Sequence, residues 1–535
     1  MRTTPKSPRL VPAAVGAGLA LAMALTACTP SIPGESEGGG GGDSSKLTML
    51  LPDTVNSIDP ALAFSTGGRQ ATWLIYEALV REDPDTGEAV PGLAESWDFT
   101  PTSASFVIKE GAMCADGSEI TAGTVARNFE RWKDPETNAP LVNNFFGSSD
   151  FTVEFDDAAR TVDVGLTVGM PFLGAEPSFT QLGIVCDSAL EDPSSLSTGS
   201  DGTGPYVVDE FVTGSHITLA RNDDYAWGPE GFSVEDLPKT VELKIVEDPN
   251  TQVNLLLGGD ADTALLQVDQ LARLEGESGF TEQVADTAVT MMMFNERDGY
   301  PTKDEAVRRA LAQALDFEEL TQVQTQGLGY VADFLRAPSN ICVDQEAIAD
   351  VIPTGGIEAA SATLEEAGYA KGDDGIYAKG GVPLSVQLLQ MEFTSAASEL
   401  VSGAWKELGV DVELDNRGSA QAVDVLYSGT GWSVSFVSMG ASQPTGFRPF
   451  FVGPAAPEGP NFGAISNPVY AQKQGEASQI GGLDSCPLWI EAEAAVVERA
   501  DWVPTIAADS KWVLGEGVSF FSDGAFVDPL TLRKN

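Results

Sequence analysis

The sequence predicts an α/β fold, because segments with the period of a strand and segments with the period of a helix follow one another along the chain. Residues 241–245 alternate apolar and polar side chains, as a half-buried strand does. Residues 252–257 then favour a short helix that ends at Gly258 and Gly259.

A longer unit of the same kind lies further along the chain. The apolar run at residues 384–389 predicts a strand, residues 397–408 carry an apolar stripe at helical spacing, and residues 410–414 alternate again. A strand–helix–strand unit normally joins two parallel strands by a right-handed crossover. The sequence therefore predicts at least one sheet with parallel strands.

Another helix is predicted after Asp304 and Glu305, because the apolar residues between 307 and 314 recur at helical spacing and form one face. Residues 140–240 are richer in short strand-like runs and turns. The sequence contains no internal repeat and no heptad array, so a solenoid or a coiled coil is not expected.

Composition and charge narrow the class of protein. The chain has 535 residues, 42% of them hydrophobic, and a formal net charge of −49. Nucleic acid is an unsuitable partner for so acidic a chain, and the acids are spread through patterned segments, as on a solvated surface. About 490 residues follow position 46, more than one core usually supports, so two or three domains are expected.

The first residues predict an export signal over residues 1–27. Three basic residues precede an apolar run over residues 10–25, and Ala27 is the small residue that a signal peptidase requires. Removal of this segment would change the formal charge from −49 to −52. An uncleaved membrane helix is the alternative for a run of this length, and no other stretch of 18 apolar residues occurs.

Leu25, Thr26, Ala27 and Cys28 resemble the bacterial lipobox, in which the Cys thiol is acylated and becomes the first residue of the mature protein. Cys28 is therefore expected to be a lipid anchor, because two or more acyl chains hold a protein stably on a membrane. Residues 28–46, rich in Gly, Ser and Glu, are expected to form a flexible tether.

The four remaining cysteines are Cys114, Cys186, Cys342 and Cys486. An even number without a CxxC pair, in an exported chain, favours disulfides over metal binding or catalysis. Three pairings are possible. If the chain folds as an earlier and a later lobe, pairing Cys114 with Cys186 and Cys342 with Cys486 keeps each bridge inside one lobe, and we predict that pairing.

The sequence offers little enzyme chemistry. His216 is the only histidine and lies in a strand-like stretch, so it supplies neither a ligand cluster nor an oriented base. The signatures GxSxG, HExxH and GxxxxGK[ST] are absent. DPDTGE at residues 83–88 lacks the further ligands of a calcium loop and favours a surface turn. We therefore expect no metal and no cofactor, while hydrolysis by paired carboxylates stays open.

Six segments, taken in order, resemble the family 5 extracellular solute-binding proteins, which are the peptide, nickel and oligopeptide receptors of ATP-binding cassette importers. The resemblance covers nearly all of residues 47–535. The segments are IYEALVREDPDTGEAVPGLAESWDF (75–99), IKEGAMCADGSEITAGTVARNFERW (108–132), GTGPYVVDEFVTGSHITLARNDDYAWG (202–228), VELKIVEDPNTQVNLLLGGDADTA (241–264), MFNERDGYPTKDEAVRRALAQALD (293–316) and LEEAGYAKGDDGIYAKGGVPLSV (364–386).

This resemblance implies a two-lobed fold of the type II periplasmic-binding-protein kind (cluster C), in which a hinge closes the lobes over a ligand. The first lobe would comprise residues 47–76, 203–288 and 505–535, the inserted subdomain residues 77–202, and the second lobe residues 289–504. Gly and Pro of GTGPY would serve a tight turn, and Trp97 and Trp227 are expected to pack in the core rather than against a ligand.

The resemblance also indicates where a ligand would bind. In the peptide receptors, an Asp in a stretch that follows a Trp pairs with the peptide's free amino terminus, but the matching residues 432–447 contain no carboxylate. The standard peptide anchor is therefore in doubt, although an acid elsewhere in the chain would serve instead. The nickel receptors depend on His, and His216 lies in a different segment, so nickel is not expected. The expected ligand-binding residues are Phe64, Ser65, Thr66, Trp432, Met439, Gly440, Ala441, Ser442, Gln443 and Asn461.

Two arginines near these segments, Arg69 and Arg448, have the chemistry to meet a ligand carboxylate, although most arginines are solvated surface groups. The sequence as a whole predicts a monomeric, lipid-anchored receptor at the outer face of the cytoplasmic membrane. It would pass a peptide or peptide-like solute to a permease. A surface-tethered carboxylate-dependent hydrolase and a structural or adhesive lipoprotein are the alternatives.

Overall fold

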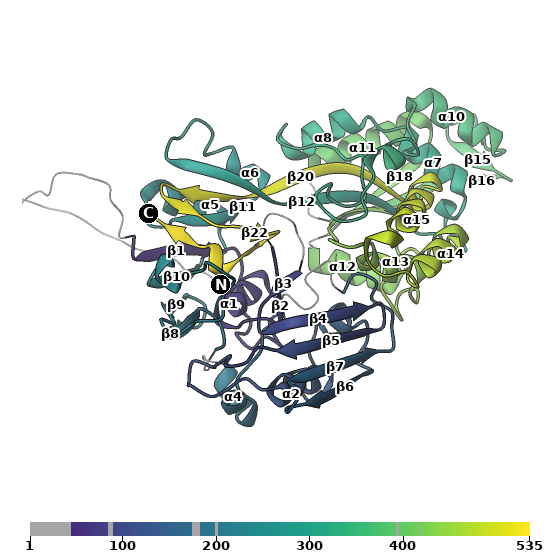
Figure 1. The fold of residues 1–535 in the computed structure, drawn as a ribbon. Helices are drawn as coiled ribbons and strands as arrows, with labels where there is room; N and C mark the ends of the chain where they lie inside the picture. Colours follow the sequence, from purple (N-terminus) through teal and green to yellow (C-terminus); the bar gives the residue numbers. More distant parts are fainter. Residues whose placement is uncertain (1–43, 84–88, 174–181, 198–201, 392–394, 418) are drawn as a thin grey trace, which may run out of the picture. The chain divides into compact units, whose positions relative to one another are not determined.

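The computed structural model describes residues 44–83, 89–173, 182–197, 202–391, 395–417 and 419–535, and Figure 1 shows their fold. The predicted signal peptide, Cys28 and nearly all of the predicted tether lie outside the described residues, as do residues 84–88 of the DPDTGE motif. Within the described ranges, no helix is both long and apolar enough to cross a bilayer.

In the described residues, eleven strands form one mixed sheet in the order β18-β17-β19-β12-β20-β11-β1-β10-β9-β8, with β13 paired to β20. Their bounds are β1 Lys46–Leu51, β8 Tyr206–Val212, β9 His216–Arg221, β10 Thr240–Ile245, β11 Thr263–Leu266, β12 Phe280–Phe294, β13 Tyr330–Val331, β17 Ser385–Met391, β18 Asp411–Arg417, β19 Val434–Met439 and β20 Trp502–Gly515.

The antiparallel strands β12 and β20 are the longest of this sheet and join its two ends. Near one end of the pair, Phe280 opposes Gly515 and β20 borders β11. Near the other end, Met293 opposes Trp502 and β12 borders β19. Figure 1 shows the two strands side by side. The predicted lobe boundaries at 288/289 and 504/505 fall inside these two strands, and the division into lobes stays a prediction.

The predicted strand–helix–strand unit is confirmed. β17 and β18 run parallel, with Val386 opposite Val412, and the helix between them, α11, spans Ser395–Leu408. The strand and helix predicted around residues 241–257 are also confirmed as β10 and α5, and β10 runs parallel to β1. His216 begins β9, the strand expected there.

A separate four-stranded antiparallel sheet, in the order β4-β5-β7-β6, lies between β3 and β8 in the chain. Helix α2 packs against β6 and β7 of this sheet. Its core is a hydrophobic cluster drawn from residues 61–186, against which Trp97 and Trp227 pack as expected. The strands are β4 Ala94–Thr100, β5 Ser103–Ile108, β6 Phe151–Asp156 and β7 Thr161–Leu166.

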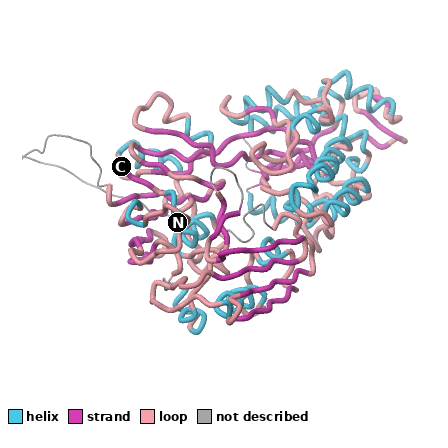
Figure 2. Tube along the Cα trace, in the orientation of Figure 1, coloured by secondary structure: helices cyan, strands magenta, loops and turns pink. Residues whose placement is uncertain are grey.

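Most helices of residues 300–500 surround the β17–β19 end of the large sheet, and Figure 2 shows how much richer in helix this part is than the earlier chain. The helix predicted after Asp304 and Glu305 is confirmed as α7, and Asp304 caps it by accepting a hydrogen bond from the Ala306 amide. Two hydrophobic clusters drawn from residues 289–507 form the core here.

The bounds of the helices are α1 Thr66–Ile75, α2 Ala122–Lys133, α3 Val142–Phe146, α4 Asp187–Glu191, α5 Pro249–Gly258, α6 Val268–Leu271, α7 Glu305–Gln313, α8 Phe317–Thr325, α9 Gln345–Ala349, α10 Gly356–Glu366, α11 Ser395–Leu408, α12 Ser419–Ser428, α13 Arg448–Val452, α14 Pro468–Ala477 and α15 Cys486–Glu498. The short strands that pair outside the two sheets are β2 Val80–Glu82, β3 Ala89–Pro91, β14 Ala370–Lys371, β15 Tyr377–Lys379, β16 Val382–Pro383, β21 Val518–Ser519, β22 Ser522–Asp523, β23 Phe526–Val527 and β24 Arg533–Lys534.

The four described cysteines form two pairs at disulfide distance, Cys114 with Cys186 and Cys342 with Cys486. This is the predicted pairing. The glycines of GTGPY have a further role that the sequence did not reveal. A Cβ atom added to Gly202 would lie 2.2 Å from the Ile75 carbonyl oxygen, and one added to Gly204 would lie 2.8 Å from it. Both positions need glycine because the chain passes directly over the end of α1.

Candidate functional site

The first predicted ligand segment, Phe64–Thr66, is held by a hydrogen-bonded turn at the start of α1. The Ser65 hydroxyl accepts a hydrogen bond from the Gly68 amide at 3.1 Å and donates one to Asn56 Oδ1 at 2.8 Å. The Asp53 carboxylate accepts from the amides of Thr66 and Gly67. These bonds occupy the free amides of the helix start. The Phe64 side chain, 60% exposed, is the part of the segment presented to solvent.

The second predicted segment, Met439–Gln443, leaves the end of β19 and is anchored from beneath by the side chain of Arg336. The Arg336 guanidinium donates to the Ser442 carbonyl at 3.2 Å, and the Asn340 side-chain amide donates to the Ala441 carbonyl at 3.2 Å. Arg336 itself is 0% exposed. It is paired with the Glu493 carboxylate, whose Oε1 lies 2.7 Å from the Arg336 Nε. A buried ion pair thus fixes the backbone of this loop.

Trp432 and Asn461, also predicted as ligand residues, are enclosed by protein. Trp432 is 0% exposed and belongs to the hydrophobic cluster below the loop. The Asn461 side chain donates to the Ile465 carbonyl at 3.0 Å and accepts from the Ile465 amide at 2.8 Å. Both side chains therefore pack inside the part of the structure that supports the Met439–Gln443 loop. No hydrogen bond or ion pair between described residues joins Phe64–Thr66 to Met439–Gln443.

A carboxylate that sequence reasoning missed, that of Asp286 on β12, lies beside the second segment. A Cβ atom added to Gly440 would lie 3.8 Å from Asp286 Oδ2. The Thr287 amide donates to Asp286 Oδ1 at 2.8 Å, and no described cation forms an ion pair with this carboxylate. Asp286 is exposed, but partial desolvation by the surrounding protein, together with the nearby charge of Asp509, raises its pKa.

Sequence alone gave no sign of this proximity, because Asp286 and Gly440 meet only through the pairing of β12 with β19, in which Val289 opposes Met439. Asp509, on β20, accepts hydrogen bonds from the Thr287 hydroxyl at 2.8 Å and from the Tyr330 hydroxyl at 3.0 Å. The loop that lacks an acid of its own therefore has one next to it.

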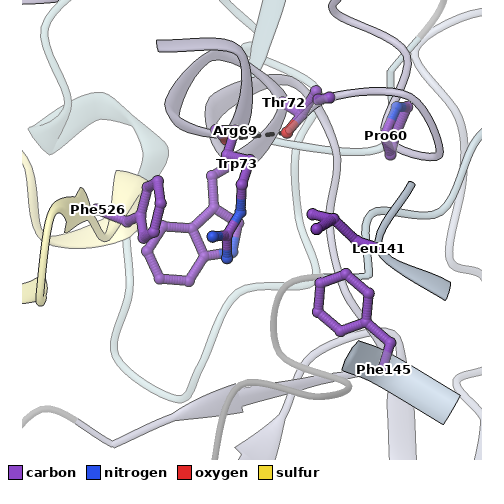
Figure 3. A pocket seen from close by; sticks show the side chains of 8 residues that line it. Pro60, Arg69, Thr72, Trp73, Leu141, Phe145 and Phe526 are labelled. Carbon is purple, nitrogen blue, oxygen red and sulfur yellow. Dashed lines mark hydrogen bonds between the residues drawn. The ribbon is translucent and has the colours of Figure 1, made fainter. Parts of the chain in front are cut away.

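Arg69, on α1, lies in a small pocket bordered by aromatic and apolar side chains (Figure 3). Its guanidinium carbon lies 4.3 Å from the centre of the Phe526 ring. Burial lowers the pKa of Arg69 to about 10, and the negative charge of Asp523 acts in the opposite direction. Arg69 is thus half-buried and not a plain surface group. Arg448, at the start of α13, is also half-buried.

His216 lies on β9, near the opposite end of the sheet order from β19, which leads into the second segment. Its Nδ1 is 3.1 Å from the Ser215 hydroxyl, and its Nε2 is 3.5 Å from a Glu210 carboxylate oxygen. Among the residues that the structure describes, no group of three or more His, Cys, Asp or Glu side chains is placed to hold a metal ion.

Comparison with known proteins gives consistent results. The family model "Bacterial extracellular solute-binding proteins, family 5 Middle" matches residues 88–456. The nickel-binding periplasmic protein of Escherichia coli is 24% identical over 395 residues, which are 69% of this chain and 70% of that protein. The periplasmic oligopeptide-binding protein OppA of Haemophilus influenzae is 24% identical over 459 residues, 79% of this chain and 80% of that protein.

Among solved structures, a substrate-binding protein from Microbacterium hydrocarbonoxydans, in complex with 4-hydroxybenzoate hydrazide, is similar with a TM-score of 0.69 and 27% identity. The similarity covers 92% of this chain and 100% of that one. This neighbour, the family match and the mixed α/β architecture confirm the predicted fold class, a two-lobed periplasmic-binding-protein fold.

Proposed function

Because the chain belongs to the bacterial extracellular solute-binding proteins of family 5, we propose that it captures a peptide or peptide-like solute outside the cell and delivers it to the permease of an ATP-binding cassette importer. The relatives named above are binding proteins, which supports a receptor rather than an enzyme.

The observation that carries the choice of cargo is the position of Asp286. A carboxylate without a cationic partner, next to a loop of small neutral residues, suits a ligand ammonium such as the amino terminus of a peptide. Loop carbonyls and hydroxyls at Met439–Gln443 would then supply neutral hydrogen bonds, and the exposed Phe64 ring would cover an apolar side chain. Trp432 and Asn461 act in this proposal as supports of the site.

Closure of the two lobes would use the β12–β20 pair as its hinge. Both predicted boundaries fall inside these strands, and the pairing register shifts twice along them, between Val284 and Asp286 and between Thr290 and Met291. Register irregularities interrupt the ladder and locally weaken it, which favours bending there. Ligand contacts made only in the closed arrangement would shift the population toward it.

The receptor would act as a monomer held at the outer face of the cytoplasmic membrane by acylated Cys28, with residues 28–46 as a tether. A Cys28→Ala protein is expected in the soluble fraction, and firm membrane attachment of that variant would contradict the anchor.

A thermal-stability screen against di- to pentapeptides, with nickel and sugars as comparison sets, tests the proposal. A receptor for peptides gives a saturable rise in melting temperature with some peptides and leaves them intact. Cleaved peptides would favour the hydrolase. A rise in melting temperature with nickel alone would indicate nickel as the ligand in place of a peptide. No response to any solute would favour an adhesive lipoprotein.

A further inference from the structure

Arg69 is a charged side chain whose guanidinium makes no close contact with a described carboxylate, although the charge of Asp523 acts on it from further away. No carboxylate in the described chain forms an ion pair with its guanidinium, and no described oxygen accepts a hydrogen bond from it. The contact recorded for the charged group is the face of the Phe526 ring, at 4.3 Å. A guanidinium offers five N–H donors in a planar fork, so its capacity to bind an anion is unused.

A second arginine near this pocket, Arg81, is by contrast paired with two carboxylates. Arg81 lines an adjacent pocket that shares Trp73 with the first. The Arg81 guanidinium donates to both oxygens of Glu77, at 2.8 and 2.9 Å, and also pairs with Asp528. The absence of such partners at Arg69 is therefore a local property and not a general feature of this region.

The walls around Arg69 are apolar and come from separate segments of the chain. Trp73 stands one turn further along α1 and contacts Phe526 edge to face, with ring centres 5.6 Å apart. Leu141 and Phe145 border the pocket from the region of α3 (Figure 3). The Thr72 hydroxyl donates a hydrogen bond to the Arg69 carbonyl at 2.9 Å and so does not donate to a ligand. The guanidinium is therefore the principal polar group that a ligand would meet.

Partial burial of this charge is unfavourable, because desolvation disfavours the charged form of the side chain and the charge of Asp523 offsets this only in part. The group nevertheless stays protonated at neutral pH. An anion that enters the pocket would restore the lost solvation through a bidentate, charge-assisted pair.

We propose that the Arg69 guanidinium binds a carboxylate of the transported solute at the mouth of this pocket, with an apolar or aromatic group of that solute lying against the partly exposed side chains of Trp73 and Leu141. The inference rests on the proposed function and names the class of its cargo: a peptide-like molecule with a free carboxylate next to an apolar side chain. A single guanidinium with Asp523 nearby suits a singly charged carboxylate better than a doubly charged phosphate.

The test compares two probes that differ only in the carboxylate, N-acetylphenylalanine and N-acetylphenylalaninamide, with inorganic phosphate as a third. Binding to the purified full-length protein is measured by isothermal titration calorimetry for the wild type and for Arg69→Gln and Arg69→Lys. Arg273→Gln is the matched control, since Arg273 pairs with the amide side chains of Asn250 and Asn254 and its loss removes the same charge elsewhere.

The wild type is expected to bind the acid in preference to the amide and to phosphate. Arg69→Gln weakens binding of the acid by about tenfold or more, Arg69→Lys has a smaller effect, and Arg273→Gln has none. The melting temperature without ligand checks folding, and if Arg69→Gln does not fold, Arg69→Lys and the acid–amide preference of the wild type decide.

Equal affinity of the wild type for acid and amide, or equal affinity of the wild type and the folded Arg69→Gln for the acid, overturns the inference. If peptides still stabilise the protein in either case, the receptor function stands and only this pocket assignment fails. If no solute of any class binds, the proposed function fails and the inference fails with it.

Discussion

Two arginines, Arg336 and Arg69, differ in how many of their N–H donors are hydrogen-bonded within the protein. Arg336 is fully buried, pairs with Glu493, and donates to the carbonyls of Ile341, Cys342 and Ser442. Arg69 is half-buried, lies against the Phe526 ring, and forms no ion pair with a described carboxylate, while the charge of Asp523 acts on it from further away. Arg336 fixes the backbone of the Met439–Gln443 loop. Arg69 keeps N–H donors that are available to an anion from solution.

The difference shows that a buried charge is not by itself a sign of function. Satisfied networks such as that of Arg336 define backbone geometry, and their removal is expected to appear in stability. A charge left unsatisfied in a pocket is expected to appear in ligand affinity. The predictions below separate these two readouts.

Arg336→Met is expected to have the largest effect, a loss of about 3–5 kcal/mol in the free energy of unfolding, because it leaves Glu493 buried without its partner. Urea denaturation measures it. Arg127→Gln, which breaks an exposed pair with Asp187, serves as the control and is expected to cost no more than about 1 kcal/mol. Similar losses of unfolding free energy in Arg336→Met and Arg127→Gln would contradict the structural role assigned to the buried Arg336–Glu493 pair.

Removal of the Cys342–Cys486 bridge by a double substitution with Ala is expected to cost about 2–5 kcal/mol. The Cys342 carbonyl accepts a hydrogen bond from Arg336 at 3.0 Å, so this variant is also expected to loosen the support of the second predicted ligand segment, Met439–Gln443. Peptide mapping of the unreduced wild type checks the premise, since a peptide joining Cys114 to Cys342 would contradict both pairings.

Asp286→Asn is expected to weaken binding of peptides with a free amino terminus by about tenfold, with little change in stability, because the lost interaction is one made only with the ligand. N-terminally acetylated peptides should distinguish poorly between the wild type and this variant. Equal loss of affinity for free and acetylated peptides would show that Asp286 acts on the loop rather than on an ammonium.

A further prediction concerns pH and a second enclosed network, formed by Arg308, Asp501 and Glu296. Burial, and secondarily the charge of Asp501, raise the pKa of Glu296 to about 8, while the nearby arginines act in the opposite direction. The folded protein therefore holds a proton that the unfolded chain releases near pH 4.5. This contribution to stability is fully present below pH 4.5 and is lost as pH rises toward 8.

Glu296→Gln should accordingly flatten the fall in stability between pH 4.5 and 8, measured by urea denaturation at several pH values. The same measurement on Asp286→Asn gives the pH dependence of stability for the loss of a more exposed carboxyl. An unchanged slope in Glu296→Gln would mean that Glu296 is ionised in the folded protein.

Local structure was largely predictable from the sequence. Asp304 at the start of α7 and the alternation around β17 and β18 are signals that neighbouring residues carry, and each produced the expected element. The disulfide pairing also followed, because only one of three pairings keeps each bridge within a lobe. The close approach of Gly202 and Gly204 to Ile75 was not predictable, because it depends on where α1 ends in space.

The candidate site was predictable only in outline. The segments at Phe64 and Met439 were expected from their position in the chain, and their role in binding stays a prediction. Whether an arginine forms an ion pair depends on residues far away in sequence. Phe526 reaches Arg69 from the last strands of the chain, and Asp286 reaches Gly440 through the pairing of β12 with β19. Neither contact has a local signature.

Native mass spectrometry of the purified protein with a stabilising peptide tests the central claim, solute capture without chemistry, most directly. The account predicts one peptide bound per chain, saturation with concentration, and release of that peptide with its mass unchanged. Released fragments, or no bound solute at any concentration, would contradict it.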